Sequence, residues 1–129
     1  MATGKFRKFE TSTGKTVLGG RNAENNEELV SQARKNEVVL HTKSPGSPFV
    51  NIKGPVSQVD REDIKEAAIF CARYSQDWRD NHRDVEVHVF SGKDIHKEKG
   101  MKLGTFGVKN FKIIKVRKED IEELESRSP

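Results

Sequence analysis

The strongest folding signal in this sequence is an apolar stripe that runs through residues 61–78. Its members recur at the i, i+3, i+4 and i+7 spacing of one helix face: Ile64, Ala67, Ala68, Cys71, Tyr74, Ser75 and Trp78. Asp60 precedes the stripe as a predicted N-cap. A helix with one apolar face must bury that face, so we expect it to pack on a β-sheet, with Cys71 as a small buried residue and not a nucleophile.

Short apolar segments on both sides of this helix supply the strands of that sheet. They are bounded by turn residues and lie at 6–9, 16–18, 38–40, 49–52, 85–90, 106–108 and 111–116. A second helix is predicted over residues 23–34 with Asn22 as its N-cap, and a turn or bulge near Asn110, where the apolar residues change parity. The order ββα-ββα-βββ predicts an α+β fold with a mostly antiparallel sheet and two main helices.

The length of 129 residues fits one domain of ordinary size. We assign residues 1–118 to this domain. Residues 119–129 hold five acidic residues and one arginine. We expect this C-terminal segment to form a short acidic helix or a fraying tail.

Positive charge is concentrated in two segments of the chain. The formal net charge is only +4, but residues 91–118 hold nine basic and two acidic residues, and residues 1–21 are also basic. The middle of the chain and the C-terminal tail are acidic and offset this charge. A dense basic segment suits a polyanion such as nucleic acid, while a solvated lysine-rich surface is the alternative interpretation.

Several classes of protein are excluded by the composition. No apolar run approaches the length of a membrane span, and the first residues lack the apolar core of a signal peptide. The single cysteine, Cys71, excludes an internal disulfide and a cysteine zinc cluster. We therefore expect a cytoplasmic protein with no membrane partner, no metal and no cofactor.

The residues Gly14, Lys15 and Thr16 invite comparison with a phosphate-binding P-loop. That motif needs a glycine five residues before its Gly-Lys pair, where this chain has Phe9. It also needs a strand-to-helix turn, whereas Gly14 lies between two predicted strands. A nucleoside triphosphatase is therefore disfavoured.

Four histidines, His41, His82, His88 and His96, are the candidates for acid–base chemistry. None has the spacing of a paired metal site. We expect His41 to point to solvent beside Lys43, and His88 to face away from the neighbouring valines. Contacts with phosphate or solvent are the favoured role, and a nuclease that uses His41 or His96 as its base is the alternative.

The segment 19–26 combines two glycines with polar residues at the start of a predicted helix. Glycine permits close backbone approach, Arg21 can bind a phosphate with its planar fork, and a helix N-terminus offers unpaired N–H groups. Asn22 and Asn26 can donate to a phosphate or to a base edge. A hairpin exit followed by a capped helix is the alternative interpretation.

Five groups of residues occur in the order found in a known family. They are Phe6, Phe9 and residues 11–14; residues 20–23 and 25–27; residues 40–43 and 45–47; Ala67, Ala68, Tyr74 and Ser75; and residues 96–104. Together they resemble NFACT-R, the RNA-binding domain of NFACT proteins, over about residues 5–117. The chain departs from the family pattern at Pro48, where multidomain members usually have histidine, and at Leu103, where proline is usual.

The resemblance implies a non-catalytic RNA-binding module for tRNA or rRNA, linked to translation, ribosome quality control or RNA modification. Its partners would be RNA and the ribosome or an RNA-modification factor. The candidate binding surface, carried over by position, is Arg21, Asn22, Asn26, His41, Lys43, His96, Lys97, Lys99 and Lys102. The coiled coil and N-terminal domain of large members are not in this sequence, so we expect a compact stand-alone version and do not carry over C-terminal tailing activity. A module that binds proteins through its acidic tail is a further alternative.

Overall fold

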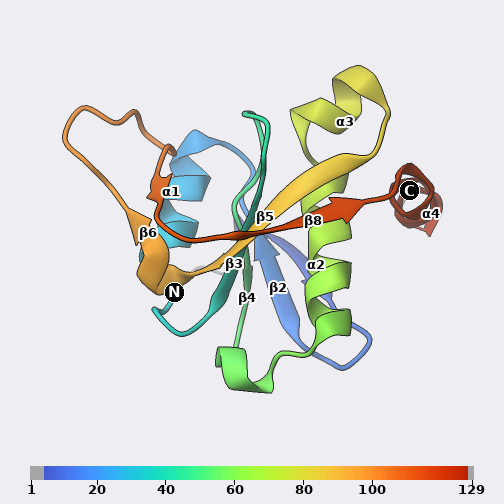
Figure 1. Cartoon of the computed structure of the whole chain (residues 1–129), viewed down its shortest axis with the longest axis horizontal. Helices are drawn as coiled ribbons and strands as arrows, with labels where there is room; N and C mark the ends of the chain where they lie inside the picture. Colours follow the sequence, from blue (N-terminus) through green and yellow to red (C-terminus); the bar gives the residue numbers. More distant parts are fainter. Residues whose placement is uncertain (1–4, 128–129) are drawn as a thin grey trace.

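A six-stranded antiparallel sheet forms the centre of the molecule (Figure 1), which we describe from a computed structural model. The structure describes residues 5–127; residues 1–4 and 128–129, which the predicted domain and tail include, lie outside the described residues. The strands are β1 (Arg7–Glu10), β2 (Thr16–Gly19), β3 (Val38–Thr42), β4 (Val50–Ile52), β5 (Val85–Ser91) and β8 (Lys112–Val116). Their order is β1-β2-β4-β3-β5-β8. This arrangement confirms the predicted α+β fold and antiparallel sheet.

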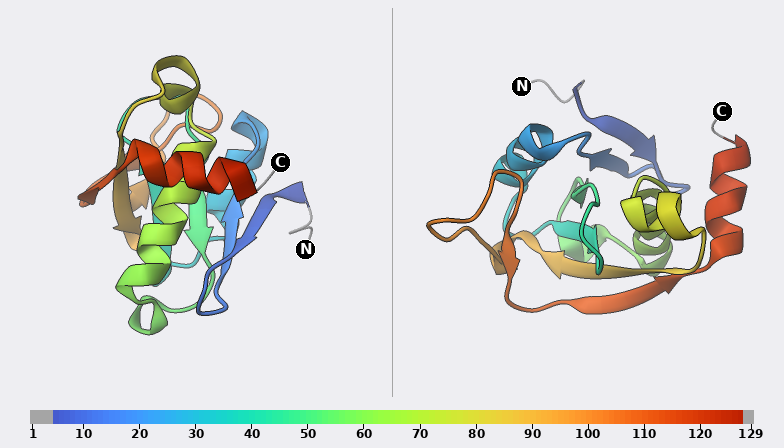
Figure 2. Two further views of the ribbon diagram at one scale, coloured as in Figure 1. Left: turned by 90° about the vertical axis from the view of Figure 1, so that its right-hand side faces the viewer. Right: turned by 90° about the horizontal axis from the view of Figure 1, so that it is seen from above.

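Helices cover both faces of the sheet. The sheet curves around α2 (Arg61–Arg73), and α1 (Ala23–Gln32) lies on the opposite face (Figure 2). The α2 face buries alternate strand residues such as Val87 and Val116 against Ala68 and Cys71. The α1 face is a smaller cluster around Leu29 and Phe49. The predicted burial of Cys71 is confirmed.

The predicted helix over residues 61–78 is interrupted at Ser75. The helix α2 ends at Arg73, and a separate short helix α3 (Gln76–Asn81) follows. The buried Ser75 hydroxyl donates to the carbonyl of Ala72 at 2.7 Å and accepts from the N–H of Trp78 at 3.2 Å. Serine thus closes one helix and caps the next, so the apolar spacing continues across a break in the backbone.

The C-terminal segment is the helix α4 (Lys118–Arg127), which packs against α2. Ile121 and Leu124 are buried in the core, and the indole Nε1 of Trp78 donates to Glu125 at 2.9 Å. Of the two expected forms, the structure has the helix. The described residues therefore contain α4 and α3 in addition to the two main helices predicted.

A two-stranded ribbon crosses the α1 side of the molecule. It consists of β6 (Ile95–His96) and β7 (Gly107–Val108), joined by the long loop between them, and it is not part of the main sheet. The chain bends at residues 109–110 before it enters β8. The predicted turn near Asn110 is thus confirmed, and the predicted strand 106–108 belongs to the ribbon.

The turn between β1 and β2 is fixed by a buried carboxylate on α2. The hydroxyl of Thr13 donates to Asp63 at 2.6 Å, and the ammonium of Lys15 lies 3.5 Å from the same carboxylate. Burial alone would raise the pKa of Asp63, but these contacts and the N–H of Asp60 lower it to about 2. Asp60 and Asp63 also form the capping box that begins α2. The Gly-Lys-Thr sequence therefore has a structural role in a hairpin.

Neither a membrane span nor a metal cluster is found within residues 5–127. None of the described helices is both long enough and apolar enough to traverse a bilayer. No three or more His, Cys, Asp or Glu side chains in this part of the chain gather closely enough to hold a metal ion.

Candidate functional site

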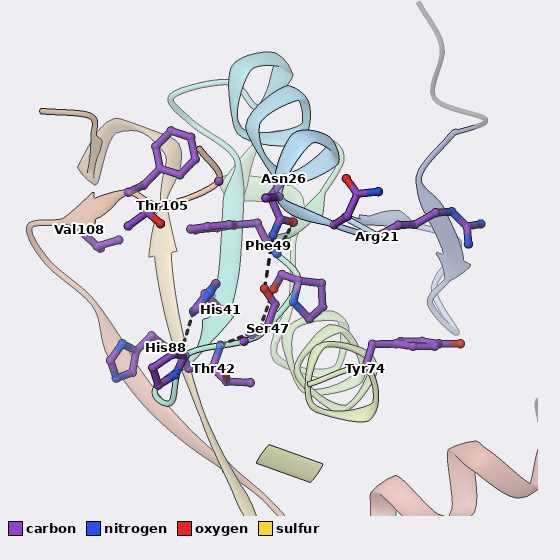
Figure 3. A pocket seen from close by; sticks show the side chains of 18 of the residues that line it. Arg21, Asn26, His41, Thr42, Ser47, Phe49, Tyr74, His88, Thr105 and Val108 are labelled. Atoms are coloured by element: carbon purple, nitrogen blue, oxygen red, sulfur yellow. Dashed lines mark hydrogen bonds between the residues drawn. The ribbon is translucent and has the colours of Figure 1, made fainter. Parts of the chain in front are cut away.

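An open groove of about 680 Å³ lies at one end of the sheet, beside the turn that follows β3 and the loop between β6 and β7 (Figure 3). Residues from the 20–26 turn, the 41–49 segment, the end of α2, α3 and the 103–108 segment line it. Its cationic residues are Arg7, Arg21, Lys43 and Arg79. No described lining residue is acidic, although the chain holds 20 Asp and Glu residues. Such a lining favours an anionic ligand.

One end of the groove is an arginine cluster around Tyr74. The guanidinium carbon of Arg7 lies 4.2 Å from the centre of the Tyr74 ring, and Nη1 of Arg79 donates to the Tyr74 carbonyl at 3.2 Å. Partial burial and the charges of Arg21, Arg79 and Arg73 lower the pKa of Arg7. An arginine keeps its charge despite such a shift, so this end concentrates positive charge that a phosphate can neutralise.

The other end of the groove presents imidazole and phenyl rings. The ring of His88 stacks on Phe111 with centroids 4.0 Å apart, and the ring of His41 packs against Phe49 at 4.5 Å. In Figure 3 the segment with Ser47 and Phe49 runs between these histidines and the side chains of Arg21 and Tyr74. This end presents planar rings, and Lys43 is close enough to His88 to act on it by its charge.

Both histidines at this end are neutral near pH 7. Burial is the main cause that lowers the pKa of His41, with a smaller contribution from His88. The pKa of His88 is likewise lowered by burial and then by Lys43. Nδ1 of His41 lies 2.7 Å from the Thr42 carbonyl, which assigns the proton to Nδ1 and leaves Nε2 as an acceptor. The expected solvent-facing His41 is instead half-buried against Phe49.

The first turn of α1 and the turn before it are held together by asparagine side chains. Asn22 caps α1 by accepting from the N–H of Asn25 at 2.8 Å. The buried Asn26 accepts from the N–H of Phe49 at 3.0 Å and donates to the carbonyl of Ser47 at 3.4 Å. A Cβ at Gly20 would collide with the Asn26 amide, so only glycine fits there. The polar groups of this turn thus position the 47–49 segment beneath the groove.

The basic loop between β6 and β7 is anchored to α1 through Glu27. Its carboxylate accepts from the N–H of Gly104 at 2.7 Å and from the ammonium of Lys97 at 3.2 Å. Lys97 also donates to the carbonyls of Lys102 at 2.6 Å and Thr105 at 2.8 Å, and lies over the ring of Phe106. Because an ammonium has three donors, these three acceptors satisfy all the hydrogen-bonding capacity of Lys97.

Comparison with known proteins decides the family. The family model of the NFACT protein RNA-binding domain matches residues 5–110 of this chain. The chain belongs to this family. The match includes residues 20–26 and the 41–49 segment, which the fold brings together in the groove described above.

Relatives of this NFACT domain are found among curated proteins and solved structures. The archaeal Rqc2 homolog aRqcH of Methanocaldococcus jannaschii is 28% identical over 107 residues, covering 79% of this chain and 16% of that protein. The Rqc2 homolog RqcH of Bacillus subtilis is 34% identical over 98 residues, covering 74% of this chain and 16% of that protein. The chain thus spans about one sixth of the length of these relatives.

A solved structure shares the fold. The C-terminal part of the fibronectin/fibrinogen-binding protein from Streptococcus suis matches with a TM-score of 0.80 and 25% sequence identity. The match covers 92% of this chain and 48% of that one. Nearly the whole NFACT domain described here therefore has a counterpart in that structure.

The nine residues predicted as a binding surface divide into three groups in the structure. Arg21, Asn22, Asn26, His41 and Lys43 line the groove. Lys99 and Lys102 are exposed on the adjoining loop. Lys97 and His96 lie outside the groove lining, and the His96 ring packs against Gly107. The structure thus brings most of the predicted set to one side of the molecule, but the asparagines and Lys97 have internal partners.

Sequence reasoning did not single out the arginine cluster as part of the site. Arg7, Tyr74 and Arg79 come from β1, the end of α2 and α3, and only the folded chain places them together. Tyr74 carried a weak signal, because it belongs to the family pattern of the central helix. The two residues that depart from the family pattern, Pro48 and Leu103, also line the groove. Pro48 is buried, and Leu103 is 55% exposed.

Proposed function

We propose that this chain is a non-catalytic RNA-binding module that recognises structured RNA, tRNA or rRNA, chiefly through phosphate contacts. The observation that carries this proposal is the groove, because its described lining has four cationic side chains and no acidic one. Two family motifs distant in sequence meet in that groove. RNA-binding surfaces combine such phosphate donors with groups that read the shape of the RNA.

Arginines supply most of the binding charge in this account. Arg7, Arg21 and Arg79 lie at one end of the groove, and a guanidinium matches two phosphate oxygens with a fixed fork. His41 and His88 add no charge at neutral pH because burial lowers their pKa values. The exposed loop lysines extend the positive surface beyond the groove.

The cellular context of the proposal follows from the named relatives. Two of them are Rqc2 homologs, and the family is defined by an RNA-binding domain. We infer that the chain acts in the cytoplasm in translation, ribosome quality control or RNA modification. Its partners would be RNA and either the ribosome or an RNA-modification factor.

Binding to labelled tRNA across a salt series tests this function. The double variant Arg21→Gln/Arg79→Gln should weaken binding and reduce the slope of log K against log salt by about 1.4–1.8. The control Arg61→Gln/Lys65→Gln removes the same charge from exposed positions on α2 that do not line the groove, and should leave the slope unchanged. Failure of the wild-type protein to retain RNA at low salt, or equal losses in both variants, would contradict the proposal.

The same preparation distinguishes binding from catalysis. His41 lines the groove but His96 does not, so the two histidines do not share a site. We expect labelled tRNA to remain intact with and without a divalent metal. Cleavage that disappears in His41→Ala would replace the binding module with a nucleic-acid-processing enzyme.

A further inference from the structure

The groove offers a ligand two chemically different ends, which a phosphate contact alone does not require. The arginine end surrounds Tyr74, with the Arg7 guanidinium 4.2 Å from the ring centre and Arg79 hydrogen-bonded to the Tyr74 carbonyl. The opposite end holds the rings of His41, His88 and Phe111, with Lys43 beside them. A ligand that fills the groove can therefore place an anionic part at the arginines and a flat part against the rings.

The flat part has a built platform at Phe111. Its ring is 45% exposed, and its inner side is stacked on His88 with ring planes 15° apart. The stacked pair holds the phenyl ring in place, so its outer face is available without rearrangement. Exposed aromatic rings of this kind stack on nucleobases, and they do so with little sequence preference.

A hydrogen-bond acceptor lies beside this platform. His41 and His88 occupy opposite positions on the adjacent strands β3 and β5, so their rings share one face of the sheet. Nδ1 of His41 is committed to the Thr42 carbonyl, which leaves Nε2 to accept from a base amino group or a ribose hydroxyl. A neutral ring suits these groups, whereas an anionic phosphate would prefer the arginine end.

The groove has room for unpaired nucleotides. Its volume of about 680 Å³ falls in the range of small-molecule sites, which is enough for a base with its sugar and phosphate. In A-form RNA the bases are stacked inside the duplex and cannot reach a protein ring unless they leave the stack. Loops, bulges and strand ends present such bases directly.

We propose that the groove binds unpaired nucleotides of an RNA, with a phosphate at the arginine cluster and a base stacked on Phe111. This inference rests on the proposed function, and it deepens that function by naming the part of the RNA that is recognised. Paired regions of the same RNA would contact the loop lysines through their phosphates.

The test compares two RNAs that carry the same number of phosphates. One is a stem–loop with an unpaired loop, and the other is a blunt, fully paired duplex. We expect the wild-type chain to bind the stem–loop about tenfold more tightly at the same salt concentration, which lies within the contribution of one stacked base. The replacement Phe111→Ala should abolish this preference, and Phe111→Tyr should retain it.

Ile113 provides the matched control. It lies on β8 two residues after Phe111, is 54% exposed, and does not line the groove. Ile113→Ala should leave the preference for the stem–loop unchanged. Equal binding of both RNAs by the wild type, or an unchanged preference in Phe111→Ala, would overturn the inference and leave RNA binding intact. Binding of neither RNA at low salt would overturn the proposed function as well.

Discussion

Replacing Lys97 tests whether a basic residue in the loop between β6 and β7 stabilises the loop or binds the RNA. Its ammonium lies 2.6 Å from the Lys102 carbonyl, 2.8 Å from the Thr105 carbonyl and 3.2 Å from Glu27. Hydrogen bonds to charged groups contribute about 1.5–3 kcal/mol each when buried. Because the Lys97 side chain is 33% exposed, we expect the three contacts together to contribute only about 1.5 kcal/mol.

The replacement Lys97→Met removes these contacts and keeps most of the aliphatic chain over Phe106. Loss of about 1.5 kcal/mol corresponds to roughly tenfold more frequent opening of the loop. Hydrogen exchange of the Gly104 amide, which is bonded to Glu27 at 2.7 Å, should accelerate by that factor. The salt slope of RNA binding should not change, because the three donors of the Lys97 ammonium already have acceptors in the protein.

Lys99→Met is the matched control, since Lys99 is an exposed lysine of the same loop. It should leave the exchange of the Gly104 amide unchanged and lower the salt slope by about 0.7–0.9 if Lys99 contacts a phosphate. The reasoning is refuted if Lys97→Met lowers the salt slope by one phosphate contact while the Gly104 amide exchanges at the wild-type rate. Lys97 would then face the RNA and not the loop.

Three further predictions concern the fold that supports the groove. Gly20→Ala should lower the unfolding free energy in urea by about 1–3 kcal/mol because its Cβ collides with the Asn26 amide; an unchanged midpoint would show that the amide can move aside. Hydrogen bonds hold the pKa of Asp63 in the folded protein at about 2, below its ordinary value of 3.8. The ionised carboxylate therefore stabilises the fold above about pH 4, and this stabilisation is lost between pH 4 and 2. Asp63→Asn should therefore reduce the loss of stability over this interval by about 2 kcal/mol, measured by urea unfolding at each pH, and parallel curves for the two proteins would contradict this. Burial raises the pKa of Cys71 to about 12, so a thiol reagent at pH 8 should react only after unfolding; rapid labelling of the native protein would place Cys71 outside the core.

The elements of the fold that depend on local signals could be predicted from the sequence. Asn22 and Asp60 cap their helices as expected, because a cap needs only the three or four residues that follow it. The break at Ser75 escaped prediction, since serine also fits the apolar spacing of a continuous helix. Ile121 and Leu124 lie at helical spacing, but only packing against α2 makes the helix part of the core.

The candidate site was less predictable, because its residues are defined by contacts between distant segments. Arg21 and His41, which local motifs single out, both line the groove. The internal hydrogen bonds of Asn26 and Lys97 join them to another loop or helix, so the sequence alone could not predict these contacts. No local pattern relates Arg7 to Arg79, which the topology brings together across more than half of the chain.

The central claim is that RNA occupies the groove, and amide chemical-shift mapping tests it most directly. The isotope-labelled chain would be titrated at low salt with the stem–loop RNA. We predict that the largest shifts fall on the residues around the groove, at Arg21, His41, Tyr74 and Phe111, with smaller shifts in the loop that carries Lys99. Shifts confined to α4 or to the N-terminal half of α2, or no shifts on addition of saturating RNA, would contradict the account.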